Sequence, residues 1–272
     1  MGLYTTALLK VLQTICDSNT HNKSLCMIGK QAILIQWESF MKTVALMNLP
    51  YDKTVYNKIK NIYPIDSYLF FKMFGLKDVH AIDYSTIDGA DIIFDLNMDL
   101  PDELKNKFDY IINGGTLEHV FDVAKAMKNI SEMLCIGGRV IHLLPVGGYV
   151  DHGFYSFSPT FFLDFYKLNG YCIHELFLEF MYGEDNSDRD EDYGVLKAYY
   201  SQDCRLFMQD WRDWRHKELN NYIKAMSKVE EIGHIYLWCI AQRKMEKHSE
   251  YPIQGYYQQI ESERKDIKRG VI

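Results

Sequence analysis

The chain has 272 residues, of which 47% are hydrophobic and 25% charged, and these are ordinary values for a globular protein. A chain of this length can bury an extensive core, so the composition argues against disorder and against a fibrous protein. The formal net charge is -7, and no basic run stands out before the C-terminal tail. Nucleic acid is therefore not expected as a partner, because binding along phosphates needs clustered Lys and Arg.

The cysteines and the apolar segments indicate the compartment. The six cysteines are scattered, without CxxC spacing or a cluster with histidines, so we expect reduced core thiols. No run of about 18 apolar residues exists, so no membrane span is predicted. The segment from Leu3 to Ile15 has an apolar helical face, which could lie on a membrane but more often packs on its own domain. We expect a cytoplasmic protein.

The first sheet strand is predicted at Ser24–Lys30, a short apolar run that ends at Gly29. Residues 31–63 are expected to be mostly helical, with Pro50 as a break. A helix follows at Asp66–Gly75, with a capping residue at its start and glycine at its end.

Two short strands are predicted at Val79–Asp83 and Ala90–Asp95, and Leu100–Leu104 can form a turn or a short helix. The apolar run that follows Phe108 is continuous, which is typical of a parallel strand covered on both faces.

The segment from Phe108 to Pro145 organises the rest of the chain. After its strand and an Asn-Gly-Gly loop, apolar residues recur at helical spacing from Phe121 to Leu134, and the Gly137-Gly138 pair is expected to stop this helix. A strand at Val140–Leu144 completes a βαβ unit. Because ligands bind at the carboxyl ends of strands in open α/β sheets, chemistry is expected at residues 113–119.

The C-terminal part is predicted to contain a helix at Pro159–Leu168 and two antiparallel strands, Tyr171–Tyr182 and Gly233–Arg243. Between these strands lies an insertion at about 183–226, acidic at first and then helical and rich in aromatic residues, which could close a site as a cap. We expect one domain over 1–272, with its core at about 24–244.

Acidic residues stand at the ends of two predicted strands. Asp83 ends the second strand, where a carboxylate can accept hydrogen bonds from both ribose hydroxyls. Asp95 ends the third, where its carboxylate and the Leu96 backbone can bind an adenine. The loop 113–115 then brings bare backbone close to the group beyond the ribose. One adenosine fits all three positions, although each acid alone could be a loop cap.

Four segments in this order resemble the class I S-adenosylmethionine-dependent methyltransferases: AIDYS (81–85), FDLNMDLP (94–101), FDYIINGGTLEHV (108–120) and GGRVIHLLP (137–145). The segment DHGFYSFSPTFF (151–162) looks like that of an uncharacterised bacterial branch. The resemblance implies a Rossmann-like, seven-stranded, mostly parallel sheet with helices on both faces and an antiparallel last strand, here with a helical insertion. It also implies S-adenosylmethionine as cofactor.

By this resemblance Asp83 holds the ribose, Asp95 and Leu96 hold the adenine, and the loop 113–115 holds the methionine portion. The expected cofactor-binding residues are Gly29, Lys30, Asp83, Tyr84, Asp95, Leu96, Asn113, Gly114 and Gly115. One departure is the first turn, CMIGKQ, which has a single glycine where the family has several. Lys30 in this turn could pair with the cofactor carboxylate or point to solvent.

Methyl transfer from a sulfonium is an in-line displacement, so alignment of acceptor, methyl carbon and sulfur supplies most of the acceleration. A hydroxyl acceptor needs a base, and His119 and His152 are the candidates, with Glu118 orienting His119 or acting itself. Each histidine could instead be an ordinary polar residue. Since the sequence contains no evident metal cluster, metal independence is predicted.

The sequence therefore predicts a methyltransferase for a small-molecule or carbohydrate acceptor, and it does not indicate an oligomeric state. A non-catalytic methyltransferase-like module is the alternative, because the CMIGKQ turn is degenerate, and cofactor binding separates the two. A nicotinamide oxidoreductase is less favoured, because no G-x-G-x-x-G follows the first strand and because an antiparallel final pair does not suit that fold.

Overall fold

The computed structural model describes residues 2–16, 23–149, 151–182, 194–199, 232–247 and 249–255. The strands are β1 (Gly2–Tyr4), β2 (Ser24–Ile28), β3 (Ala32–Leu34), β4 (Asp78–Asp83), β5 (Ile92–Ile93), β6 (Phe108–Gly114), β7 (Leu134–Gly147), β8 (Tyr171–Tyr182), β9 (Gly194–Tyr199) and β10 (Ile232–Arg243). The helices are α1 (Thr5–Cys16), α2 (Trp37–Leu46), α3 (Lys53–Ile59), α4 (Ser67–Met73), α5 (Val123–Met133) and α6 (Pro159–Leu168), with 3-10 turns η1 (Asp102–Leu104) and η2 (Leu117–His119).

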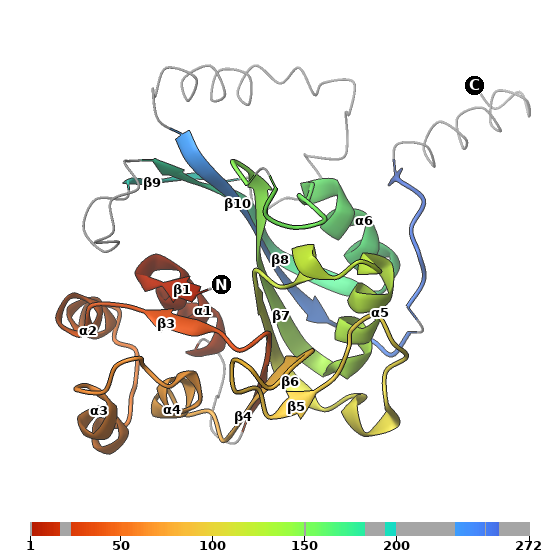
Figure 1. Ribbon diagram of the computed structural model, residues 1–272. Coiled ribbons are helices and arrows are strands. Elements are labelled where there is room, and N and C mark those ends of the chain that lie inside the picture. The colour runs from red at the N-terminus through yellow and green to blue at the C-terminus, as the bar shows by residue number, and fades with distance from the viewer. Residues whose placement is uncertain are drawn as a thin grey trace, which may run out of the picture.

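An eight-stranded sheet forms the centre of the fold, in the order β5-β4-β2-β6-β7-β10-β8-β9 (Figure 1). The strands from β5 to β7 in this order are parallel, and β10 runs antiparallel to both β7 and β8. The predicted fold class is therefore confirmed: a mostly parallel, Rossmann-like sheet whose last strand is antiparallel. The predicted pairing of the two C-terminal strands is also confirmed.

Strand β9 adds an eighth strand at the edge, antiparallel to β8. It lies inside the insertion that was predicted to be helical, so that prediction is wrong for residues 194–199. The backbone N–H and C=O groups along the outer edge of β8 pair with β9. The periodicity of the sequence does not reveal such a distant pairing partner. The remainder of the insertion lies outside the described residues.

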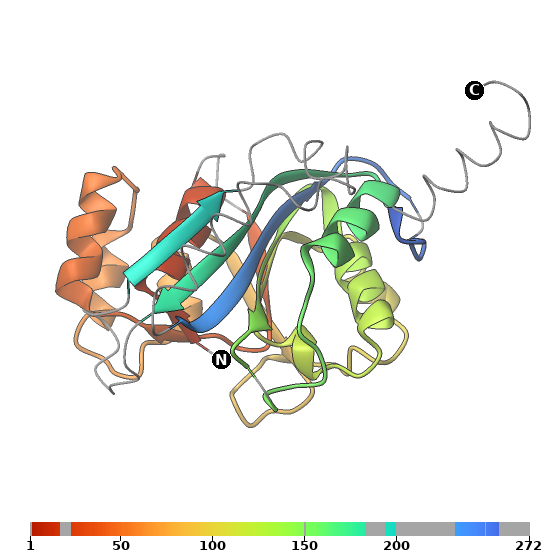
Figure 2. The ribbon, with the colours of Figure 1, turned by 90° about the horizontal axis from the view of Figure 1, so that it is seen from above.

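Each face of the sheet carries its own core, as expected for strands covered on both sides. In β2, Leu25 and Met27 belong to one core, whereas Cys26 and Ile28 belong to the other, because successive side chains point to opposite faces. Helices α1–α4 gather on the first face and α5 and α6 on the second (Figures 1 and 2). Glycine-rich and polar loops are left at the carboxyl ends of the strands.

The N-terminal segment packs on its own domain, as expected. The apolar face of α1 is fully buried. The preceding strand β1 pairs in parallel with β3, a small sheet that the sequence did not predict. Buried Glu179 joins it to the main sheet, because its Oε2 accepts hydrogen bonds from the Tyr4 hydroxyl at 2.7 Å and from Trp238 Nε1 at 2.6 Å.

Three local predictions are corrected. Residues 32–34 form β3 instead of helix, because β1 provides a pairing partner. Helix α5 ends at Met133 rather than at the glycine pair, and β7 continues through Gly138, where a Cβ would lie 2.9 Å from the Asp109 carbonyl oxygen. Strand β7 also continues through Pro145, where a register shift in β10 accommodates a residue without an N–H.

Two other expectations are settled in part. Cys26 and Cys239 are buried as predicted, but Cys172 is exposed, so not every cysteine belongs to the core. Within the described part of the chain, no helix has both the length and the apolar character needed to cross a membrane.

Candidate active site

Three adjacent strand ends meet at one edge of the sheet. Ile28 at the end of β2 is in register with Ile82 of β4 and with Asn113 of β6. The Gly29 N–H donates to the Ile82 carbonyl at 2.7 Å, and the Thr116 hydroxyl donates to the Ile28 carbonyl at 2.6 Å. The structure thus brings the predicted first turn, the end of β4 and the loop after β6 together.

Glycines allow the two loops to approach closely. Gly29 has φ of +71°, and a Cβ there would lie 2.4 Å from Thr116 Oγ1. A Cβ on Gly114 would lie 2.6 Å from Oε1 of Gln31, and Gly115 has φ of +89°. The glycines therefore let the turn after β2 and the loop after β6 pack closely against each other.

Gln31 is a site residue that the sequence did not reveal. Its side chain is buried, and its Nε2 donates to the carbonyls of Ile28 and Gly29 at 3.1 and 3.0 Å. These bonds hold the turn that follows β2. A polar residue two positions after the single glycine was the available signal.

Lys30 contacts the protein itself. Its ammonium lies over the Tyr68 ring, 5.1 Å from the centroid, in a cation–π contact. The Tyr68 hydroxyl in turn donates to the Gly89 carbonyl at 3.0 Å. Lys30 thus joins the first turn to helix α4 and to the loop before β5.

The acids at the strand ends differ in their engagement. Asp83 is half-buried, and among the residues that the structure describes its Oδ1 receives one hydrogen bond, a long one of 3.4 Å from the Ser85 N–H. Tyr84 beside it is 76% exposed, so an aromatic ring stands open at this edge. In contrast, Asp95 Oδ1 accepts hydrogen bonds from the backbone and the side chain of Asn97, which is the behaviour of a loop cap. Leu96 is buried.

The Asn113 side chain is occupied by the protein itself. Its Oδ1 accepts from the N–H groups of Thr116 and Leu117, both at 3.3 Å, and its Nδ2 lies 3.0 Å from His142 Nδ1. The residue is fully buried. Asn113 therefore shapes the loop instead of presenting its side chain to a ligand.

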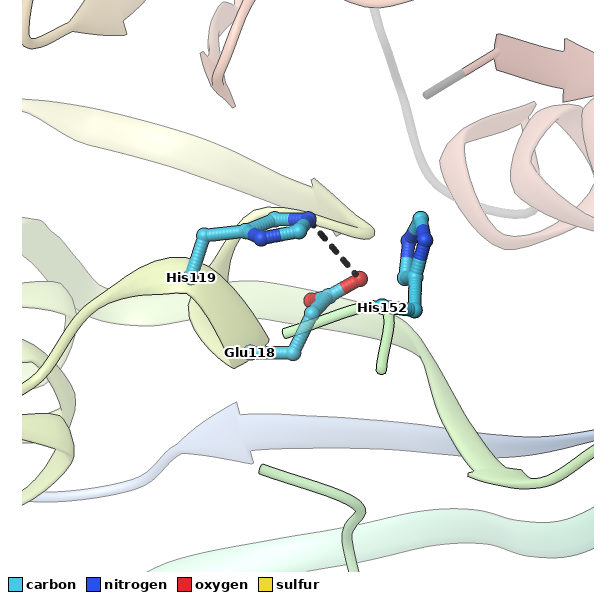
Figure 3. Close-up of side chains that lie close together, drawn as sticks. All are labelled: Glu118, His119 and His152. Carbon is cyan, nitrogen blue, oxygen red and sulfur yellow. Dashed lines mark ion pairs between the residues drawn. The ribbon is translucent and has the colours of Figure 1, made fainter. Parts of the chain in front are cut away.

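The predicted catalytic side chains lie together. Glu118 and His119 come from η2, and His152 comes from the loop after β7 (Figure 3). Glu118 Oε1 lies 3.9 Å from His119 Nε2, and the centroids of the two imidazole rings are 5.0 Å apart. One possible ligand atom from each of the three residues lies within 4.8 Å of the other two.

Backbone hydrogen bonds hold the His152 loop against η2. The N–H groups of Phe154 and Tyr155 both donate to the Glu118 carbonyl, at 2.8 and 3.3 Å. Gly153 permits this contact, since a Cβ there would lie 2.9 Å from the same carbonyl oxygen. The position of His152 beside Glu118 is thus fixed by the main chain.

Burial determines the electrostatics of this cluster. The Glu118 side chain is fully buried, and neither carboxylate oxygen has a hydrogen-bond partner within the described part of the chain. Burial raises the pKa of Glu118 to about 7. Burial also lowers the pKa of His119, and the neighbouring His152 lowers it further.

Aromatic side chains surround the cluster, and the sequence did not assign them to a site. Phe121 was expected on the buried face of a helix but precedes α5 and is 71% exposed. It meets Phe154, which is also exposed, edge to face at 5.4 Å. On the other side Tyr149 stacks on His234 at 4.2 Å and lies 5.2 Å from His152.

No protein family profile matches this chain, and no curated protein sequence is detectably similar. Solved structures are similar at low identity. A putative methyltransferase from Bacillus halodurans is 11% identical, with a TM-score of 0.46 over 87% of this chain and 99% of its own. A Thermotoga maritima protein, described as an S-adenosylmethionine-dependent methyltransferase and possible histamine N-methyltransferase, is 15% identical, with a TM-score of 0.36 over 88% of this chain and 89% of its own.

Phosphoethanolamine N-methyltransferase 2 from Haemonchus contortus, solved with S-adenosyl-L-methionine, is 13% identical, with a TM-score of 0.42 over 88% of this chain. The present chain spans about half of that protein, 52% of its length. At such low identities and TM-scores, these similarities assign neither a cofactor nor a substrate to this chain.

Proposed function

We propose that this protein is an S-adenosylmethionine-dependent methyltransferase that acts on a small-molecule or carbohydrate acceptor by in-line methyl transfer. One observation carries the proposal: the turn at Gly29, the carboxylate of Asp83 and the backbone of 113–115 share one sheet edge, directly before the Glu118–His119–His152 cluster. In open α/β sheets this edge is where ligands bind.

In this proposal Asp83 accepts from the ribose hydroxyls, since within the described part of the chain its carboxylate has one internal hydrogen bond, and that bond is long. The exposed ring of Tyr84 lies next in the chain, and the remaining oxygen of Asp95 with the Leu96 backbone faces the adenine. The backbone of 113–115 and of Gly29 contacts the methionine portion. Gln31 stabilises this turn through hydrogen bonds to the carbonyls of Ile28 and Gly29. Lys30 stabilises it through its cation–π contact with Tyr68.

The acceptor binds beside the imidazoles of His119 and His152. Phe121 and Phe154 offer exposed ring faces next to them, which suit the apolar faces of a small organic molecule or a sugar. Alignment of the acceptor oxygen with the methyl carbon and the sulfur is the main contribution. The lowered pKa of His119 keeps its ring neutral near pH 7, as a base requires.

Calorimetry with S-adenosylmethionine and S-adenosylhomocysteine tests this function. We expect the full chain to bind both, and Asp83→Ala to weaken binding at least about tenfold, the effect of losing about 1.4 kcal/mol. Asp88→Ala is the matched control, because it removes the same charge from an exposed position of the same loop. Failure of the folded wild-type protein to bind either compound would favour the non-catalytic module instead.

A further inference from the structure

The position of the Glu118 carboxylate destabilises the folded state. It is fully buried, and within the described residues neither of its oxygens accepts a hydrogen bond. A buried polar group without partners is destabilising, and a buried carboxylate is normally paired with a cation or coordinates a metal. The short turn that carries this glutamate is held on one side by the Asn113 side chain, whose Oδ1 accepts from the Leu117 N–H, and on the other by the N–H groups of Phe154 and Tyr155, so its placement is a fixed feature of the site.

The two neighbouring imidazoles are directed to the same place. His119 lies in the same turn as Glu118, with its Nε2 3.9 Å from Glu118 Oε1 (Figure 3). His152 comes from the opposing loop and places a ring nitrogen within 4.8 Å of the ligand atoms of the other two residues. Donor atoms around one ion lie about 3 to 3.5 Å apart when the metal–ligand bonds are about 2.1 Å long. Here the three possible ligand atoms lie within 4.8 Å of one another, which is a somewhat wider spacing. Both histidines are exposed, so their rings can turn toward the carboxylate.

We propose that Glu118, His119 and His152 bind one divalent transition-metal ion. Two imidazole nitrogens and one carboxylate oxygen form a borderline donor set, which suits Zn²⁺, Mn²⁺ or Fe²⁺ better than Ca²⁺ or Mg²⁺. The prediction of metal independence considered only spacing along the sequence, whereas this ligand set is assembled from two loops.

The role of the ion rests on the proposed function, but its binding does not. With three protein ligands on one side, the exposed side of the ion is open to the oxygen of a hydroxyl acceptor. With the ion in place His119 is a ligand and no longer the base, because the bound hydroxyl releases its proton to water more readily. Its oxygen then forms the bond to the methyl carbon while the carbon–sulfur bond breaks, and the sulfur keeps the electron pair and becomes a neutral thioether. The acceptor class is therefore an alcohol or phenol.

Metal titration of the full chain tests the site. The protein is freed of any affinity tag, dialysed against EDTA and titrated with Zn²⁺ by calorimetry, and Mn²⁺ binding is followed by electron paramagnetic resonance. We expect one tight equivalent of Zn²⁺ in the wild-type protein, weakened at least about tenfold in Glu118→Gln and in His152→Ala. His174→Ala, which removes an exposed histidine of β8, is the control and should bind as the wild type does.

His152→Ala covers the risk that a change at buried Glu118 harms folding, since His152 is exposed. The proposal is overturned if the wild-type protein binds no Zn²⁺, or if the cluster variants bind it as tightly as His174→Ala does. Calorimetry with S-adenosylhomocysteine on the same samples separates the two proposals. Cluster-dependent Zn²⁺ binding without cofactor binding would remove the methyltransferase function and leave the metal site standing.

Discussion

His142 shows how a single buried side chain can make the stability of the protein depend on pH. Its ring lies in β7, fully buried, with Nδ1 3.0 Å from Asn113 Nδ2 and Nε2 2.6 Å from the Tyr166 hydroxyl. Burial lowers the pKa of His142 to about 3. Because Asn113 holds the loop after β6, the contact between His142 and Asn113 helps to keep the candidate site in place.

The contribution of His142 to the free energy of unfolding should therefore fall as pH falls below about 6.5, while Glu118, whose pKa burial raises to about 7, contributes with the opposite sign, so that a His142 variant is needed to isolate the effect. The unfolded chain binds a proton at His142 near pH 6.5, but the folded chain does so only near pH 3, so the unfolded state holds the extra proton between these values. One proton contributes a slope of about 1.4 kcal/mol per pH unit. Urea unfolding at several pH values between 7 and 4.5 measures the free energy of unfolding and therefore this slope.

The free energy of unfolding of His142→Gln should change with pH by a slope that differs from the wild-type slope by about that amount, because the variant no longer loses stability through His142 as pH falls. The control is His174→Gln, which replaces an exposed histidine and should leave the dependence as it is in the wild type. An unchanged slope in His142→Gln would mean that the buried ring is not the source of the effect.

At the scale of the elements, the turn after β2 depends on contact with the loop after β6. Gly29→Ala forces a residue with a side chain into φ of +71° and also places its Cβ 2.4 Å from Thr116 Oγ1. Gly137→Ala meets the same kind of backbone strain, with φ of +85°, but its Cβ has no neighbour within 4 Å. The pair separates backbone strain from the contact between loops.

We expect Gly137→Ala to lower the free energy of unfolding by about 1 to 2 kcal/mol, the cost of the left-handed backbone. Gly29→Ala should cost at least about 1 kcal/mol more, because the Thr116 hydroxyl must leave the Ile28 carbonyl. Urea unfolding of both variants gives the difference. Equal losses would show that the two loops do not depend on each other.

The elements were predicted well where local signals are strong. The Pro159–Leu168 helix has proline in its first turn and Ser158 as its cap, and its predicted bounds are those observed. Asp66 caps α4 as expected. Strands β1, β3 and β9 were missed, because each forms where a segment distant in the sequence supplies the pairing partner.

On the scale of the whole molecule, strand order should determine local stability. Strands β2, β6 and β7 have neighbours on both sides and cores on both faces, whereas β5 has two residues and lies at the edge. Amide hydrogen exchange should therefore be slowest in β2, β6 and β7 and much faster in β5. Protection of the β5 amides equal to that of β6 would contradict the edge position of β5.

The sequence by itself determined the mostly parallel sheet and its antiparallel last pair, and it predicted a set of candidate site residues at the carboxyl ends of the strands. Apolar periodicity, caps and glycines encode these features locally, and the carboxyl ends of neighbouring parallel strands must share an edge. It also selected Glu118, His119 and His152 as chemically active groups.

Only the tertiary structure decided what those groups contact. Lys30 lies over Tyr68, Asn113 is engaged with His142, and a carboxylate without hydrogen-bond partners in the described chain faces two imidazoles. Each of these contacts joins segments that are distant in the sequence. Their distances depend on how loops dock, through main-chain bonds such as those to the Glu118 carbonyl, and no local pattern of residues encodes that docking.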